Sequence, residues 1–262
     1  MAASGLFRTI SNVSGIIREL EAMGMRVEIG DDFSEYHLLR DSQIDRTKMF
    51  PVFDGSSSFI DYTNGFWVCG FNETNELMHT QAVRRFDLSE MNLGRHFDIH
   101  RHKYITPDTT PDPDLTFYRG PEALRTITGN VCYHGDFWLH ARGLGGPRSV
   151  IGTALLSRLL FEVVYRLWEP DFVTGLVPKK LATKGLHMRY GYTHCEPGQW
   201  IGPDGQVTDE DHLVSITASE LSSSIRNSIP SLPSRTREAT PARQEQRTRS
   251  RSEMGQVALT KN

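Results

Sequence analysis

The sequence predicts an α/β (α+β) domain in which a mixed, mostly antiparallel sheet is flanked by helices. Three observations indicate this class. Residues 65–88 contain two arms rich in β-branched and aromatic residues around the polar turn 72–76. Residues 130–141 form a partly alternating strand that leads through a glycine-rich turn into the long apolar helical pattern of residues 150–168. Short strand and helix patterns then alternate to about residue 219.

Helical patterns precede the hairpin. Apolar residues recur at three- and four-residue steps over residues 10–23, and the pattern stops near Gly24. A second helical pattern covers residues 34–48. We therefore expect residues 1–50 to form a helical extension that packs on a main domain of residues 51–221.

The middle and the end of the main domain differ in regularity. Residues 92–121 are rich in His, Asp, Thr and Pro, and each proline removes a backbone donor, so we expect a surface loop or an insertion. After the long helix we expect a buried strand over residues 171–177 and a helix over residues 179–192. The last two strands are expected within residues 193–201 and 212–219.

The charge of the chain is unevenly distributed. The formal net charge of the 262 residues is -3, but residues 222–262 carry eight Lys or Arg against three Asp or Glu, and residues 1–221 carry 21 against 29. This basic segment has almost no large apolar side chains, so we predict a disordered tail. It has no interleaved aromatic residues for base stacking, so nucleic-acid binding is not favoured and a solubilising tail is preferred.

The cysteines and the hydropathy of the chain indicate the cellular compartment to expect. Cys69, Cys132 and Cys195 are odd in number and far apart, so neither a disulfide framework nor a zinc knuckle is indicated. No stretch approaches the ~20 apolar residues of a membrane span, and the first twenty residues do not resemble a signal peptide. We expect a soluble cytoplasmic protein without a membrane span, of undefined oligomeric state.

The glycine-rich turn before the long helix can hold an anion. The first-turn amides of a helix have no internal partner, and the helix dipole is positive at that end. The turn lacks the ending of a P-loop and does not fit GxGxxG, and a tight corner that packs a helix on a sheet is the competing interpretation. The residues expected to bind the anion are Leu139, Ala141, Arg142, Gly143, Gly145, Gly146, Arg148, Ser149, Gly152 and Thr153.

Two segments resemble motifs of the GNAT (N-acetyltransferase-like) acyltransferase superfamily. VIGTALLSRLL (150–160) is similar to the start of the family's pyrophosphate-binding helix, with Gly152 and Ala154 at its two small positions. LHMRYGY (186–192) is similar to the Gly-aromatic ending of a later family helix. Together with the element order, the likeness extends over residues 60–220.

The turn itself departs from the family pattern, as in a divergent member. Ser149 stands where the family has Gln or Arg, and Arg148 comes one residue early. In the alternative register Arg142 and Gly145 match, but Pro147 replaces the last small residue. These departures leave the donor open between coenzyme A and an acyl carrier protein, which related families use.

The resemblance implies transfer of an acyl group from a thioester donor, acyl-CoA, to the amine of a small molecule, with no permanently bound cofactor. A first alternative is an N-acyl amino acid or acyl-homoserine-lactone type synthase supplied by acyl carrier protein. A second is a domain that binds a ligand or a partner without catalysis.

Four residues are candidates for catalysis. His187 occupies the family position of a tyrosine acid and can exchange a proton near neutral pH. His134, Asp136 and His140 lie on or near the strand before the turn, and regular alternation would place all three on one face, opposite Phe137 and Leu139. The competing interpretation is that they are ordinary exposed polar residues of a strand or a helix.

The stretch HFDIHRH (96–102) invites a metal interpretation, because alternate residues of a strand share a face and neutral imidazoles bind zinc. No cysteine or second carboxylate–histidine pair completes the set nearby, so we predict no metal and prefer a polar insertion that shapes the acceptor pocket.

Overall fold

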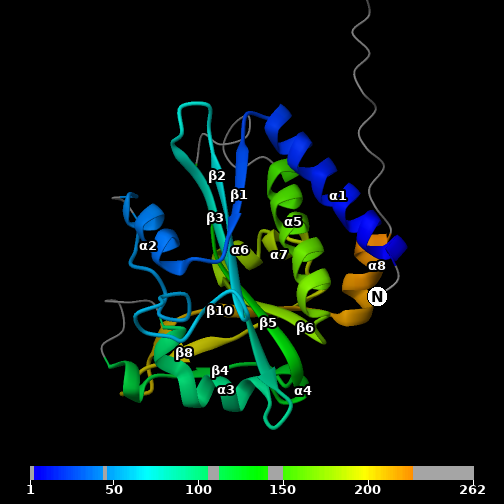
Figure 1. Cartoon of the computed structure of the whole chain (residues 1–262). Coiled ribbons are helices and arrows are strands. Elements are labelled where there is room, and N and C mark those ends of the chain that lie inside the picture. Colours follow the sequence, from blue (N-terminus) through cyan, green and yellow to red (C-terminus); the bar gives the residue numbers. More distant parts are fainter. Residues whose placement is uncertain (1–2, 44–45, 106–111, 141–149, 227–262) are drawn as a thin grey trace, which may run out of the picture. The chain divides into compact units, whose positions relative to one another are not determined.

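Seven strands form the main sheet, and the predicted fold class is confirmed (Figure 1). Every neighbouring pair is antiparallel except β5 and β6, which are parallel. In spatial order the strands are β1 (Arg26–Gly30), β2 (Gly65–Phe71), β3 (Leu77–Leu88), β5 (Gly129–Leu139), β6 (Phe172–Pro178), β10 (Asp211–Thr217) and β7 (His194–Glu196).

The computed structural model describes residues 3–43, 46–105, 112–140 and 150–226. These residues fall within one compact unit, Met1–Ser228. The tail expected to be disordered lies almost entirely outside the described residues. No helix in the described part of the chain is both long enough and apolar enough to span a membrane.

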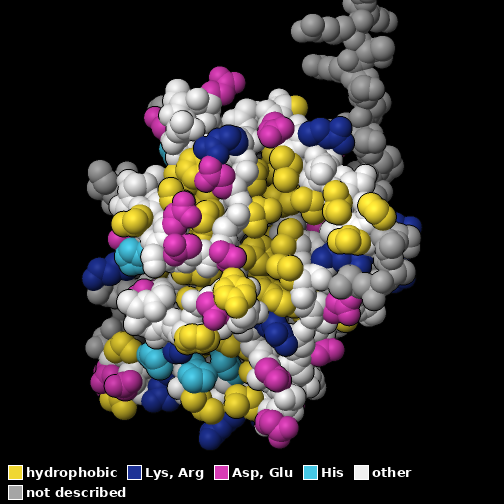
Figure 2. Space-filling view, in the orientation of Figure 1, with side chains coloured by type: hydrophobic (Ala, Val, Ile, Leu, Met, Phe, Trp, Pro, Cys, Tyr) yellow, Lys and Arg dark blue, Asp and Glu magenta, His cyan; other side chains and the backbone are white. Residues whose placement is uncertain are grey.

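Three helices cover one face of the sheet, namely α1 (Ala3–Ala22), α5 (Val150–Trp168) and α8 (Ala218–Arg226) (Figure 1). The apolar stripe of α5 is fully buried at Leu156, Leu159 and Leu160. The short helices α6 (Lys179–Ala182) and α7 (Leu186–Arg189) complete this layer. The outer face of α1 exposes Leu6, Phe7 and Ile10, and Figure 2 shows apolar side chains gathered over this helix.

The other face carries a second core, rich in aromatic side chains. It is covered by α2 (Phe33–Asp41), α3 (Leu93–His100), η1 (Arg101–Lys103), η2 (Pro113–Leu115), α4 (Ala123–Thr126) and a small sheet of β4 (Phe117–Arg119), β8 (Gln199–Ile201) and β9 (Val207–Asp209). Strand alternation divides the two cores, because Cys132 packs in the first and its neighbours Val131 and Tyr133 pack in the second.

Three segments differ from the sequence prediction. The stretch expected to be an irregular insertion contains α3, whose N-terminus is capped by Asn92 through a 2.9 Å bond from the Arg95 amide. The helix expected over residues 179–192 is broken into α6 and α7 by Gly185, which has a φ of 71°. The helix expected over residues 34–48 ends at Asp41.

Strand β1 was not predicted. It lies between α1 and α2 and pairs with β2 from Arg26 opposite Phe71 to Gly30 opposite Trp67. A Cβ at Gly30 would lie 2.2 Å from the Trp67 indole, so glycine permits this close packing. Residues 1–50 therefore contribute an edge strand to the sheet in addition to helices.

Candidate active site

The sheet splits between its two parallel strands. Strands β5 and β6 pair only over Val131–Tyr133 opposite Phe172–Thr174. At the next position a Cβ on Gly175 would lie 2.7 Å from the His134 carbonyl oxygen, so glycine allows the strands to stay close where the ladder ends. Beyond this point the strands line a cavity of about 660 Å³. A ligand can therefore enter between the two strands and reach the β5 edge.

A β-bulge in β5 changes which side chains share a face. Ala82 of β3 pairs with Gly135 and Thr80 pairs with Trp138, so two β5 residues stand opposite Gln81. Asp136 is the extra residue and has a φ of 50°, a left-handed conformation that Asp tolerates better than most residues. The sequence prediction that His134 and Asp136 share a face is wrong, because the bulge inverts the alternation between them.

The Asp136 carboxylate is buried and bound by three side chains. Its oxygens accept bonds from Arg40 Nε at 2.9 and 3.0 Å, from Arg46 Nη2 at 2.9 Å and from the Tyr36 hydroxyl at 2.5 Å. The Asp136 side chain is 2% exposed and that of Arg40 3%. Burial lowers the pKa of Arg46, and the nearby carboxylate opposes this shift. Two cations thus neutralise one anion, which lines the cavity without being free for proton transfer.

The same cluster holds the bulge in place. Thr80 Oγ1 donates to the Asp136 carbonyl at 2.9 Å and accepts from Arg46 Nη1 at 2.9 Å. The Arg46 guanidinium lies over the Trp138 ring, 4.8 Å from its centroid. The backbone of the strained residue is therefore fixed by β3 and by residue 46, which comes from the segment after α2.

His134 lies on the opposite side of β5, in a closed hydrogen-bond network. Gln81 Nε2 donates to the Leu156 carbonyl at 2.8 Å, so its oxygen faces His134 Nε2 at 3.1 Å and the proton is on Nε2. His134 Nδ1 then accepts from the Tyr192 hydroxyl at 2.9 Å. Burial lowers the pKa of His134 to about 3, so the ring is neutral near pH 7 and both of its nitrogens are occupied.

A second carboxylate, Asp211, lines the cavity and forms no salt bridge with any residue that the structure describes. Burial and the neighbouring Asp209 raise its pKa to about 6, and a 3.1 Å bond from Trp200 Nε1 opposes that rise. Burial also raises the pKa of Asp209, which the Lys180 charge opposes. Tyr118 donates to the Asp211 carbonyl at 2.8 Å and fixes this end of β10.

Sequence reasoning missed this pair. The stretch TDED (208–211) is polar and acidic, which is typical of a solvated turn. Only the pairing of β10 with β6, from Asp211 opposite Pro178, brings it to the cavity. The local signal would have been a carboxylate at the first position of a strand whose apolar run begins at Leu213.

The other catalytic candidates lie outside the cavity lining. His140 follows β5, where its amide donates to the Met78 carbonyl at 2.8 Å. His187 lies on α7, and its buried Nδ1 has no partner among the described residues. Leu186, at the start of α7, and Tyr190, which directly follows α7, line the cavity. The structure therefore brings Asp136 and His134 to the cavity, on different sides of β5, and leaves His140 and His187 beside it.

The predicted anion-binding residues are only partly described. Leu139 is buried at the end of β5, and Gly152 and Thr153 lie in the first turn of α5. Ala141, Arg142, Gly143, Gly145, Gly146, Arg148 and Ser149 lie outside the described residues.

The histidine-rich stretch forms a helix and not the strand considered for a metal site. His96 and His100 lie one turn apart on α3, with ring centroids 4.7 Å apart. His96 Nε2 bonds the Tyr104 hydroxyl at 2.7 Å, and burial lowers the pKa of His96 to about 3. Within the described residues, no three His, Cys, Asp or Glu side chains gather as a metal would require.

The protein therefore has a mixed sheet that splits between β5 and β6, and a cavity large enough for a small ligand lies at the split. No family model and no curated protein matches the chain. Solved structures to which it is similar include FeeM, an N-acyl amino acid synthase from uncultured soil microbes, at 12% identity over 81% of this chain and 92% of that one, with a TM-score of 0.37.

Two further similar structures are acetyltransferases. The aminoglycoside acetyltransferase AAC(6')-Ib, in complex with coenzyme A and kanamycin, has 13% identity over 76% of this chain and 98% of its own, with a TM-score of 0.40. Spermidine N-acetyltransferase from Vibrio cholerae has 10% identity over 75% and 95%, with a TM-score of 0.39.

Proposed function

We propose that this chain is an acyltransferase that moves an acyl group from a thioester donor, acyl-CoA, to the amine of a small molecule. The observation that carries the proposal is the split between β5 and β6, which opens onto a cavity lined by Asp211, a carboxylate without a salt bridge to the described residues. A cavity of about 660 Å³ is of the size typical of small-molecule sites.

The donor is assigned to the β5 side of the split. Strand β6 leaves the β5 edge beyond Tyr133 without a ladder partner, so an amide of this edge can hold the thioester oxygen as charge develops on it. The turn at 141–149 and the first turn of α5, with Gly152 and Thr153, are assigned to the pyrophosphate of the donor. Mutation of Gly152 to a bulky residue tests this assignment by its effect on donor binding.

The acceptor is assigned to the side of Asp211. An amine must lose a proton to attack a thioester, and a carboxylate with a pKa of about 6 is ionised near neutral pH and still basic enough to accept it. The nitrogen forms a bond to the acyl carbon, the carbon–sulfur bond breaks, the ammonium proton passes to Asp211, and the thiolate leaves and is protonated to the thiol.

The catalytic candidates of the sequence divide into two groups in this proposal. Asp136 and His134 are positioning residues, because their polar atoms are engaged by neighbouring side chains. His187 and His140 stay predictions, with His187 as the candidate that returns a proton to the leaving thiolate.

The aromatic part of the cavity lining bears on the length of the acyl chain. Aromatic side chains of the second core reach the lining there, namely Phe50, Phe53, Tyr104 and Tyr133. This wall can hold an acyl chain longer than acetyl, which favours the N-acyl amino acid type of synthase as the second candidate. Comparison of acetyl-CoA, long-chain acyl-CoA and acylated carrier protein as donors separates the two.

The direct test is release of free thiol from each donor in the presence of a panel of amines. We expect amine-dependent release by the natural chain and by Asp204→Asn, a control on an exposed loop, and its loss in Asp211→Asn. A thermal shift provides an independent measure, because a donor at about 100 times its Kd stabilises the fold by about 2.7 kcal/mol. Donor binding without turnover with any amine would support a domain that only binds ligands.

A further inference from the structure

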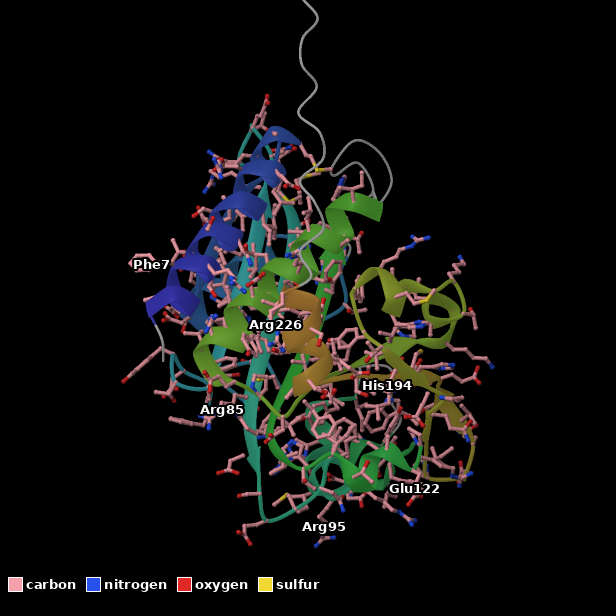
Figure 3. All side chains as sticks on the ribbon, turned by 90° about the vertical axis from the view of Figure 1, so that its right-hand side faces the viewer. Phe7, Arg85, Arg95, Glu122, His194 and Arg226 are labelled. Atoms are coloured by element: carbon pink, nitrogen blue, oxygen red, sulfur yellow. The ribbon has the colours of Figure 1, made fainter. Side chains whose placement is uncertain are left out.

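A second cavity of about 180 Å³ lies where α1, α5 and α8 meet, on the face of the sheet opposite the aromatic core. Three arginines line it, Arg8 of α1, Arg166 of α5 and Arg226 of α8. The hydroxyl-bearing side chains of Thr9, Tyr165 and Ser222 also line it. Figure 3 shows Arg226 on α8 beside α5. Every side chain of the lining is described, and none of them is acidic.

The three guanidinium groups have no carboxylate bound to them among the described residues. Glu162, the nearest acid on α5, accepts from Asn12 Nδ2 at 2.9 Å and pairs with Arg158 at 3.7 Å. The Glu162 carboxylate interacts electrostatically with Arg166, but Glu162 does not line the cavity. The cavity is therefore a concentration of positive charge without a bound counter-anion from the described chain.

Arg166 is held in place by its neighbours. Its Nε donates to Thr9 Oγ1, and its guanidinium lies over the Tyr165 ring at 5.4 Å. A Cβ at Gly5 would lie 3.1 Å from Arg166 Nη2, so the absence of a side chain there leaves room for the guanidinium. The planar fork of donors is thus positioned between two helices before any ligand binds.

Helix dipoles explain only part of this arrangement. Arg166 and Arg226 are in the last turns of α5 and α8, where a cation is stabilised. Arg8 lies close to the N-terminal end of α1, where the dipole gives a cation no stabilisation. An anion between the three would explain why this third arginine joins the other two.

We propose that this cavity binds a small dianionic oxyanion, inorganic phosphate or a phosphate monoester. Phosphate oxygens accept paired bonds from arginine forks, and the Ser222 hydroxyl, which accepts from the Tyr165 hydroxyl, can donate a further one. Arg166 is sixteen residues from the start of α5, about 24 Å along the helix, so the site is separate from the donor turn. Phosphate bound here joins α1, α5 and α8 and stabilises the fold without displacing the donor.

The experiment is a titration of the full chain with inorganic phosphate at constant ionic strength, followed by melting temperature and by calorimetry. The test variant is Arg8→Gln/Arg226→Gln, because neither side chain bonds another helix within the described part of the chain. The matched control is Arg95→Gln, an exposed arginine of α3 far from the cavity (Figure 3). We expect saturable stabilisation in the natural chain and in Arg95→Gln, and a Kd raised about tenfold or more in the double variant.

Two outcomes overturn the proposal: no saturable phosphate binding, or an unchanged Kd in the double variant, which would place the phosphate elsewhere, for example at the donor turn. The source of the phosphate is tested with glycerol phosphate and with vesicles containing phosphatidic acid. Binding of glycerol phosphate supports a soluble monoester, and binding that also appears on vesicles identifies a lipid headgroup. Coenzyme A binding by the double variant, measured in parallel, is expected to be unchanged, so the donor site is tested separately.

Discussion

Asp136 and Asp211 line the same cavity, and they differ in the charges that surround their carboxylates. Asp136 is bound by two arginines and a tyrosine hydroxyl. Asp211 receives one neutral bond from Trp200 and stands near a second acid, Asp209. The first anion is fixed by its partners, whereas the second gains a proton readily as the pH falls. The difference shows that burial beside a cleft does not by itself make a carboxylate a base.

Under the proposed function, the comparison assigns a structural role to the Asp136 wall of the cavity and a catalytic role to the Asp211 wall. Asp136 is in the bulge of β5 and holds the strand that presents the donor side. Asp211 is at the start of β10, across the split, where the acceptor is assigned. Changing each residue should therefore disturb a different property, stability for the first and turnover for the second.

The largest effect is expected for Asp211→Asn, which keeps the shape and removes the base. We expect kcat/KM for amine acylation to fall about 10²- to 10⁴-fold. In the natural chain the rate should fall as the pH drops through about 6, because Asp211 is then protonated. A pH–rate profile of the natural chain, of Asp211→Asn and of the control Asp204→Asn checks both points. A variant with full activity would remove Asp211 from the mechanism.

The contribution of Asp211 to stability depends on pH in the opposite direction to its contribution to the rate. A carboxyl whose folded pKa is raised binds its proton more tightly in the folded state, so its contribution to stability grows as the pH falls from about 6 toward 3.8. Asp211→Asn should lose this pH dependence and keep its fold at pH 7. Urea melts at several pH values separate a loss of catalysis from a loss of structure.

The next largest effect is expected for Asp136→Asn. Asn also tolerates the left-handed conformation of this position, so the change isolates the charge. Removal of the anion leaves two buried cations, Arg40 and Arg46, without compensation, at a cost of about 3–5 kcal/mol. Chemical denaturation measures this cost. A stability equal to that of the natural chain would show that the bulge does not depend on this ion cluster.

Much of the fold was predictable from sequence because its periodic patterns are long. The hairpin, the strand before the glycine turn and the helix after it are confirmed. Strand β1 was not predicted, because its five residues of mixed polarity give no clear alternation of apolar and polar side chains. The site was less accessible, since a single extra residue in β5 inverts the side-chain order and no local pattern marks it.

Asp211 shows a second limit of sequence reasoning. Its chemistry depends on burial and on its distance from Asp209, Trp200 and the strand β6, all of which are tertiary properties. In sequence it stands in an acidic run that is typical of a surface turn. The resemblance to a family directed attention to the strand before the glycine-rich turn, which lines the cavity, and the catalytic roles of His187, His140, Asp136 and His134 stay predictions.

A smaller effect tests the split itself. In Gly175→Ala the new Cβ would lie 2.7 Å from the His134 carbonyl oxygen. This oxygen belongs to the backbone, so relieving the clash requires a shift of strand β5 that destabilises the fold. We expect a loss of about 1–3 kcal/mol together with reduced donor binding, because β5 and β6 are forced apart. Gly15→Ala in α1 is the control, since nothing lies within 4 Å of its Cβ and a helix interior favours alanine. Equal behaviour of the two variants would mean that close contact at the split is not required.

The smallest effect is expected for Tyr192→Phe, which removes the donor to His134 Nδ1 and leaves the ring neutral and buried. The cost is about 1 kcal/mol, and Tyr62→Phe, at an exposed position, should cost nothing measurable. The folded pKa of His134 is lowered to about 3, so the unfolded chain binds a proton first and stability falls as the pH drops below about 6.5. His134→Gln should reduce that slope between pH 6.5 and 4.5 and leave the part due to His79 and His96, whose pKa values burial also lowers to about 3. A slope that persists unchanged would show that His134 is protonated in the folded chain and that its network is open to proton exchange.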